Sequence, residues 1–209
     1  MSIRLGDTAP DFTANTTQGL LSFHDWKAGS WAVLFSHPAD FTPVCTTELG
    51  RTAALSSEFA ARNAKPIAVT VDSIEAHHRW IPDIAEAAGD EVDFPIIADQ
   101  DRAVANAYDM LHPGAGDTST VRSVFIIDPN DKVRLTITYP KSVGRNFTEI
   151  LRALDALQAT DAAPISTPAE WTPGERVIVA PTISTEDARA RFSNVDEVTS
   201  YLRFADAPA

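Results

Sequence analysis

The chain has 209 residues, 44% of them hydrophobic and 22% charged, a globular composition that excludes the disordered and fibrous classes. It carries 17 basic and 29 acidic residues, for a net charge of −12. Nucleic acids and anionic membranes are bound through clustered Lys and Arg, so we expect neither as a partner. The longest apolar runs are about five residues, whereas a membrane-spanning helix needs roughly 20. Residues 1–7 contain no apolar signal segment, and we therefore expect a cytoplasmic protein.

Short apolar runs alternate with helix-like stretches in the first part of the chain. The runs predict strands covered on both faces at 31–35, 66–71, 94–98 and 124–127. The stretches between them predict helices at about 46–63, 74–88 and 101–110. Alternation of this kind is typical of an α/β fold with a central, largely parallel sheet.

The pattern changes after a turn cluster at 128–131. Residues 133–139 alternate between apolar and polar, which predicts a half-exposed strand that forms a hairpin with the strand before it. A helix is expected to begin near Asn146 and to end at about 158. These elements together predict a first domain over residues 1–160.

The remaining residues form a C-terminal extension, residues 161–209. Residues 159–173 are rich in Ala, Thr and Pro, and we interpret them as a linker. The sequence then predicts a strand at 177–180, a helix near 184–192 and a short apolar segment at 201–204. About 40 residues rarely form a stable core alone, so we expect the extension to pack on the main domain or on another subunit.

Cys45 is the only cysteine, which excludes an internal disulfide and a thiolate-rich metal site. It lies in the segment that follows the first buried strand, where open α/β sheets place ligand-binding and catalytic groups. Thr42 is a candidate N-cap and Pro43 a candidate first helical residue, which would make Cys45 the third residue of the helix. The unpaired amides and the helix dipole at that position favour a thiolate, the reactive form of cysteine. The alternative is a small buried hydrophobic residue.

Arg122 is predicted on the same strand face as the apolar Val124 and Ile126. A buried guanidinium needs an anionic partner, because an unpaired buried charge is very costly. The sequence leaves two partners open, the thiolate of Cys45 and a carboxylate. Glu48, one helical turn beyond Cys45, is a candidate for pairing with Arg122 or Arg145, and is otherwise a solvated helix residue.

The segment Pro38–Cys45 resembles the Pro-x-x-x-Thr-x-x-Cys motif of the peroxiredoxins. The flanking His37, residues 46–50 and residues 139–147 resemble the 1-Cys peroxiredoxins of the peroxiredoxin-six type, within the AhpC/TSA superfamily. The resemblance extends into the tail, with Trp171 and residues 180–182. It implies a thioredoxin-like α/β sandwich with a central mixed sheet and a small C-terminal extension.

The resemblance also implies a thiol peroxidase and assigns roles to individual residues. Cys45 corresponds to the peroxidatic nucleophile, Thr42 to the hydroxyl that bonds the peroxide, Pro38 to the residue that shields the pocket and Arg122 to the cation beside the thiolate. His37, Val44 and Arg145 are candidate substrate-binding residues. For His37 the alternative is a loop cap, and for Arg145 a surface position.

The expected substrates are hydrogen peroxide and organic hydroperoxides, which oxidise Cys45 to a sulfenic acid. The chain offers no second cysteine, so an external thiol must reduce it: glutathione, a thioredoxin-type protein or another small reductant. No cofactor or metal is expected. The resemblance further implies a homodimer or a higher oligomer, with the extension at the dimer interface.

Two further sets of residues carry weaker expectations. The peroxiredoxin-six type is sometimes credited with phospholipase activity, and Ser30 and His24 match two of its three residues. Asn130 stands where the family carries an Asp, which argues against that activity and favours Ser30 as a turn residue. The adjacent His77 and His78 point to different sides of a helix and are expected to be solvated.

Two alternatives to a peroxidase remain at this point. A redox sensor would signal to a partner through oxidation of Cys45, and would be oxidised quickly but reduced slowly. A purely structural thioredoxin-like module would have an unreactive Cys45.

Overall fold

The computed structural model describes residues 3–116 and 118–207. The chain divides into two compact units, residues 1–147 and residues 148–209, called here the N-terminal and the C-terminal unit. The two units divide after Phe147, the first residue of the long helix α6 (Phe147–Ala162). The sequence placed the boundary after residue 160, near the end of the same helix.

A seven-stranded sheet forms the centre of the N-terminal unit, in the order β2-β1-β5-β4-β3-β6-β7. Its strands are β1 (Thr13–Thr16), β2 (Gly19–Ser22), β3 (Trp31–Ser36), β4 (Ala64–Thr70), β5 (Ile96–Ala98), β6 (Arg122–Ile127) and β7 (Val133–Tyr139). Only the β3–β4 and β4–β5 pairs are parallel. The mixed sheet is confirmed, and the expectation of a largely parallel one is wrong, because β6 returns antiparallel to β3 and the β1–β2 hairpin adds antiparallel to β5.

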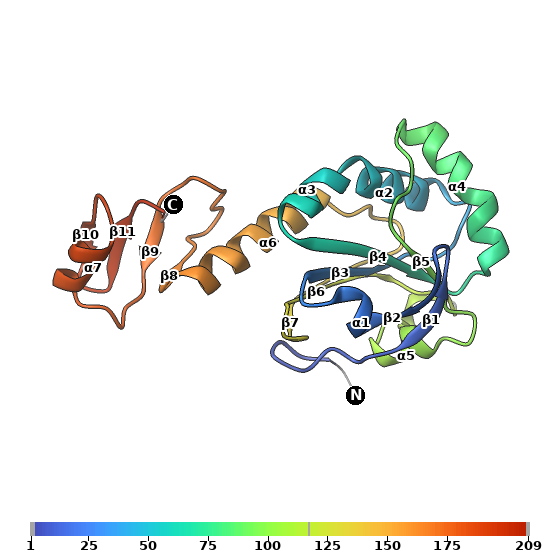
Figure 1. The fold of residues 1–209 in the computed structure, drawn as a ribbon, viewed down its shortest axis with the longest axis horizontal. Helices are drawn as coiled ribbons and strands as arrows, with labels where there is room; N and C mark the ends of the chain where they lie inside the picture. The colour runs from blue at the N-terminus through green and yellow to red at the C-terminus, as the bar shows by residue number, and fades with distance from the viewer. Residues whose placement is uncertain (1–2, 117, 208–209) are drawn as a thin grey trace. The chain divides into compact units, whose positions relative to one another are not determined.

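Helices cover both faces of this sheet, with α2, α3 and α4 on one side and α1 and α5 on the other (Figure 1). They are α1 (Phe23–Lys27), α2 (Pro43–Ala54), α3 (Ser56–Ala61), α4 (Ile74–Ala88) and α5 (Ala103–Ala107), with a 3₁₀ turn at Pro113–Ala115. The predicted helix over 46–63 is two helices, separated at Leu55. The helix predicted over 74–88 is α4.

The central strands supply the core that holds the active-site segment. All six residues of β3 are buried, as the continuous apolar run predicted. The predicted β6–β7 hairpin is confirmed, and β7 is only half-buried. Because β3 ends at Ser36 and α2 begins at Pro43, the segment between them lies at the carboxyl end of the buried strand.

The C-terminal unit has its own four-stranded antiparallel sheet, in the order β10-β11-β9-β8. Its further elements are β8 (Ile165–Ser166), β9 (Val177–Val179), α7 (Thr185–Arg191), β10 (Asp196–Thr199) and β11 (Leu202–Ala205). Two small apolar clusters stabilise it, one around Trp171 and one around Ala188. The predicted linker over 159–173 is therefore wrong in part, since α6 runs to Ala162 and Ile165 pairs with Val179.

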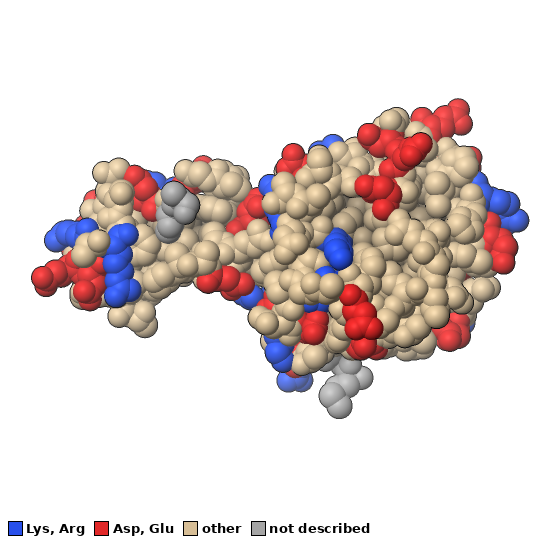
Figure 2. Space-filling view, in the orientation of Figure 1, with Lys and Arg blue, Asp and Glu red and all other residues tan. Residues whose placement is uncertain are grey.

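Charged side chains are dispersed over the molecular surface drawn in Figure 2. Acidic and basic groups lie in small separate clusters on that face, among uncharged residues. None of the helices in the described part of the chain combines the length and the apolarity needed to cross a membrane.

Candidate active site

The first turn of α2 places Cys45 as the sequence predicted. Thr42 is the N-cap residue with an extended backbone, Pro43 is the first helical residue and Cys45 the third. The Thr42 hydroxyl does not cap the helix, however, because it donates to the carbonyl oxygen of Ala39 at 2.9 Å. Its oxygen lone pairs are thereby left to accept a hydrogen bond from another group.

The Cys45 side chain is completely buried. Nη1 of Arg122 donates to its sulfur atom at 3.3 Å. The dipole of α2 and the guanidinium act in the same direction, since each favours negative charge on sulfur. The contact identifies Cys45 as a candidate nucleophile instead of an inert core residue.

Arg122 is held rigidly, at the start of β6. Its Nε and Nη2 donate to the carbonyl oxygen of Lys141 at 2.9 and 2.7 Å. Nη1, which contacts the sulfur of Cys45, also donates to Oε2 of Glu48 at 2.6 Å. The sequence left two partners open for Arg122, Cys45 and a carboxylate, and the guanidinium contacts both.

Glu48 forms a buried ion-pair network with the two arginines. Arg145 donates its Nε to Oε1 at 3.0 Å, its Nη2 to Oε2 at 2.6 Å and its backbone N–H to Oε1 at 2.8 Å. Burial alone would raise the pKa of Glu48, but hydrogen bonds and charge from Arg145, with the charge of Arg122, hold it below its usual range. Glu48 is therefore an ionised carboxylate that orients both guanidinium groups.

Arg145 is a buried residue instead of the surface residue that the sequence left possible. Its Nη1 donates to the carbonyl oxygens of Ser36 and Ser123 at 2.8 and 3.1 Å. Burial lowers the pKa of its guanidinium, and Glu48 opposes this effect. It connects the end of β3, strand β6 and helix α2, without a direct contact to Cys45 among the described interactions.

Pro38 lies in the segment between β3 and α2, and Val44 directly precedes Cys45. Pro38 is buried, and Val44 is half-buried. A Cβ atom placed on Gly144 would lie 3.4 Å from Cγ1 of Val44, so the segment before α6 approaches the first turn of α2 closely. Phe41 and Val143 are exposed by 52% and 45%.

His37 is completely buried, and its Nε2 lies 3.1 Å from Oδ1 of Asp40. Burial lowers the pKa of His37 more than Asp40 raises it. The expectation that His77 is solvated is wrong: it is completely buried, and its Nδ1 lies 2.6 Å from Oδ2 of the same carboxylate. His78 is exposed, as expected.

Sequence reasoning gave no role to Asp40 and overlooked the burial of His77. A local signal was present, because His77, Trp80 and Ile84 are spaced as one helical face and all three are buried in α4. No comparable local signal marks Asp40, whose partner His77 lies 37 residues away in the sequence.

The residues matching the phospholipase set are each engaged elsewhere. The Ser30 hydroxyl donates to the carbonyl oxygen of Lys27, and Ser30 lies in the turn before β3, as predicted. Nε2 of His24 contacts the carbonyl oxygen of Ala9 at 3.0 Å. The backbone N–H of Asn130 donates to Asp128 at 2.9 Å. These contacts assemble no serine–histidine pair.

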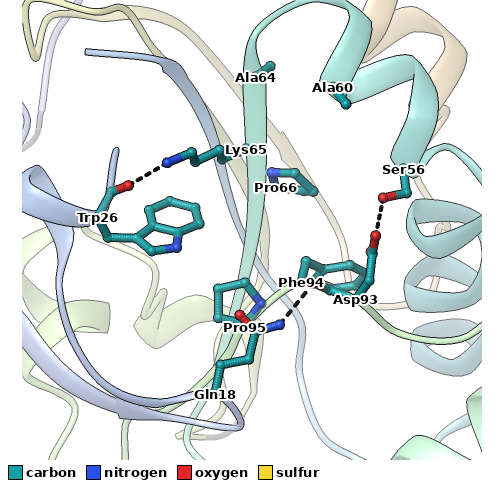
Figure 3. Close-up of a pocket in the computed structure, with 10 residues that line it drawn as sticks. All are labelled: Gln18, Trp26, Ser56, Ala60, Ala64, Lys65, Pro66, Asp93, Phe94 and Pro95. Carbon is teal, nitrogen blue, oxygen red and sulfur yellow. Dashed lines mark hydrogen bonds between the residues drawn. The ribbon is translucent and has the colours of Figure 1, made fainter. Parts of the chain in front are cut away.

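Figure 3 shows the side chains around a pocket of about 220 Å³, which is lined by none of the predicted site residues. Its lining residues are Gln18, Trp26, Ser56, Ala60, Ala64, Lys65, Pro66, Asp93, Phe94 and Pro95. Nζ of Lys65 donates to the Trp26 carbonyl, and Ser56 donates to Asp93. We assign it no chemistry. Within residues 3–116 and 118–207, no group of three or more His, Cys, Asp or Glu side chains is arranged to hold a metal ion.

Two protein-family models and a curated relative match most of this chain. The model of the AhpC/TSA family matches residues 5–136, and that of the C-terminal domain of 1-Cys peroxiredoxin matches residues 156–194. A 1-Cys peroxiredoxin of Dictyostelium discoideum is 47% identical over 207 residues, which cover 99% of this chain and 86% of that protein.

Solved structures agree in fold. A mutant of peroxiredoxin 6 from Arenicola marina superposes with a TM-score of 0.93 at 44% identity, covering 99% of both chains. The yeast mitochondrial 1-Cys peroxiredoxin superposes with a TM-score of 0.92 at 48% identity, covering 98% of this chain and 99% of that one. With both domains matched and one cysteine in its sequence, this chain belongs to the 1-Cys peroxiredoxins of the AhpC/TSA family and is a thiol-dependent peroxidase.

Proposed function

We propose that this peroxidase reduces hydrogen peroxide and organic hydroperoxides at Cys45, and that an external thiol then restores the enzyme. The observation that carries the proposal is the buried contact of 3.3 Å between Nη1 of Arg122 and the sulfur of Cys45. A guanidinium fixed there favours the thiolate and stabilises the negative charge that develops on the peroxide.

In the proposed reaction, the Cys45 thiolate donates an electron pair to the terminal oxygen of the hydroperoxide. The O–O bond breaks, and the hydroperoxide proton moves to the leaving oxygen, which departs as water or an alcohol. The sulfur is oxidised by two electrons to a sulfenate, which takes a proton from solvent and becomes the sulfenic acid.

The remaining residues bind and orient the substrate in this proposal. The hydroxyl oxygen of Thr42, whose hydrogen is engaged by the Ala39 carbonyl, accepts the O–H of the peroxide. Pro38, which is buried, shields the thiol from water in this proposal, and His37 and Val44 contact the substrate. Arg145 acts through Glu48, which it fixes, instead of touching the peroxide.

The reductant must come from another molecule, because the sequence has one cysteine. A thiolate attacks the sulfenic sulfur and displaces hydroxide, which leaves a mixed disulfide. A second thiol then releases Cys45 as a thiolate. The yeast relative is described as resolving its thiol through glutathione and thioredoxin systems, and we propose the same two classes of reductant here.

Turnover separates the peroxidase from a redox sensor. With excess hydrogen peroxide and either glutathione or a thioredoxin-type reducing system, we expect peroxide consumption to continue far beyond one equivalent per chain. Each arm is compared with Cys45→Ser under the same conditions, which should consume no peroxide above background. Consumption that stops after one equivalent with both reductants would favour the sensor.

The oligomeric state of the protein and its cellular compartment stay predictions. We propose a homodimer or larger oligomer, with the extension over residues 161–209 at the interface, in the cytoplasm. Exposed apolar side chains support a contact surface on the C-terminal unit, where Val198 and Tyr201 are 58% and 70% exposed. Light scattering of the intact protein tests the oligomer.

A further inference from the structure

A second buried polar cluster includes residues of the active-site segment, and none of its described hydrogen bonds joins it to the charge network of Glu48. Asp40 is its centre, with His37 on one carboxylate oxygen at 3.1 Å and His77 on the other at 2.6 Å. Both imidazoles are completely buried, and the side chain of Asp40 is 2% exposed. Two buried histidines on one carboxylate are costly to desolvate unless each proton has an assigned place.

The hydrogen-bond partners assign those protons. Nε2 of His77 lies 3.3 Å from the carbonyl oxygen of Ile97, which only accepts, so that nitrogen carries a hydrogen. Burial alone would raise the pKa of Asp40, but its hydrogen bonds with His37 and His77 hold the pKa below its usual range. An ionised carboxylate accepts at both oxygens, so His37 donates from Nε2 and His77 donates from Nδ1 as well as from Nε2.

This arrangement leaves one atom without a partner. Because burial lowers the pKa of His37, the ring is neutral, and with the hydrogen on Nε2 its Nδ1 carries a lone pair. Nδ1 is buried and has no hydrogen-bond partner among the described residues. An orphaned acceptor of this kind in a native structure calls for an explanation such as a ligand.

The orphaned nitrogen belongs to the active-site region. His37 directly follows β3, at the same strand end where Arg145 binds the carbonyl of Ser36. Its ring lies 5.4 Å from that of Trp80, whose Nε1 donates at 3.2 Å to the hydroxyl of Thr46, the residue after Cys45. The His37 ring is therefore linked through Trp80 to the residue that follows Cys45.

We propose that Asp40 and His77 are positioning residues that fix His37 in the Nε2–H tautomer, so that its Nδ1 is a second acceptor, beside the Thr42 hydroxyl oxygen, for the terminal O–H of the hydroperoxide. The inference rests on the proposed peroxidase chemistry at Cys45. It assigns a second acceptor of the substrate O–H to a side chain whose orientation is set by His77 on α4, 37 residues along the chain from Asp40.

Two variants of His77 and one of its neighbour test the proposal by stopped-flow oxidation with hydrogen peroxide. His77→Leu removes the hydrogen bond to Asp40 and is expected to slow oxidation of Cys45 by about 3- to 10-fold. His77→Asn places an N–H where Nδ1 lies and should recover most of the rate. His78→Leu changes the adjacent, exposed histidine and should leave the rate within about twofold, as surface changes do.

A spectroscopic readout on the parent protein does not depend on the fold of a His77 variant. The ¹⁵N chemical shifts of the parent protein, with His37 assigned through His37→Gln, should show a bare Nδ1 and a protonated Nε2. A protonated Nδ1 in the parent would overturn the proposal. So would a His77→Leu enzyme as fast as the parent, whereas a parent no faster than a free thiol would instead contradict the peroxidase proposal.

Discussion

Replacement of Glu48 by Gln is expected to destabilise the protein by about 3–5 kcal/mol at pH 7, the usual cost of removing one partner from a buried ion pair. The carboxylate accepts four hydrogen bonds, three from Arg145 and one from Arg122. Its side chain is 2% exposed, so water cannot replace it. Glutamine keeps the shape but leaves two buried guanidinium groups without a counter-charge. Chemical denaturation followed by fluorescence measures the change.

The matched control is Glu58→Gln, which removes the ion pair between Glu58 of α3 and Arg62, the C-cap residue of that helix. The Glu58 side chain is 53% exposed. Exposed pairs contribute at most about 1 kcal/mol. Acid provides a second check, because the pKa of Glu48 is lower in the folded protein than in the unfolded chain. The stability it contributes is complete above its ordinary pKa and is lost as the pH falls through its lowered value. The difference between parent and Glu48→Gln should therefore shrink in acid, and a constant difference would contradict an ionised Glu48.

Replacement of Arg122 by Met is expected to slow oxidation of Cys45 by about 10²–10³-fold, the cost of losing one preorganised charge-stabilising donor. The guanidinium of Arg122 donates a hydrogen bond to the sulfur of Cys45. It is fixed by the carbonyl of Lys141 and by Glu48, so it needs no reorganisation when the O–O bond lengthens. Methionine fills much of the same volume without the charge. Single-turnover stopped-flow oxidation measures the rate.

The control for charge is Arg51→Met, which removes an exposed arginine from the same helix α2. Its oxidation rate should stay within about twofold of the parent, because exposed charges are screened by solvent and salt. Glu48 retains Arg145 in the Arg122→Met variant, and its unfolding curve shows whether it folds. A folded Arg122→Met protein oxidised as fast as the parent would remove Arg122 from the mechanism.

The chemistry of the site could be predicted where the signal was local. Thr42 and Pro43 marked the start of α2, and therefore the place of Cys45, because capping preferences act over a few residues. Arg122 on an apolar strand face required an anion, but only the fold shows that Glu48 and Cys45 share it. The burial of His77 could be predicted from its helical spacing with Trp80 and Ile84, whereas its pairing with Asp40, 37 residues away, depends on the fold.

The secondary structure, like the site, could be predicted where the signal was local and was missed where it depends on long-range pairing. Continuous apolar runs located β3 and the core of β4, since buried strands need them. The short β1 was missed because its residues, Thr13–Thr16, are mostly polar and become a strand through pairing with β2 and β5. In the C-terminal unit, Ile165 was assigned to a linker because its two-residue strand exists only against β9. Long-range pairing decided each of these elements.

The most direct test of the account is oxidation of the reduced protein by one equivalent of hydrogen peroxide, followed by intact mass, with Cys45→Ser beside the parent. We expect the parent to gain one oxygen atom far faster than a free small thiol such as cysteine, and the serine variant to gain none on that timescale. Parent oxidation no faster than the free thiol would mean that the contact between Arg122 and Cys45 does not activate the sulfur, and would contradict a peroxidatic Cys45.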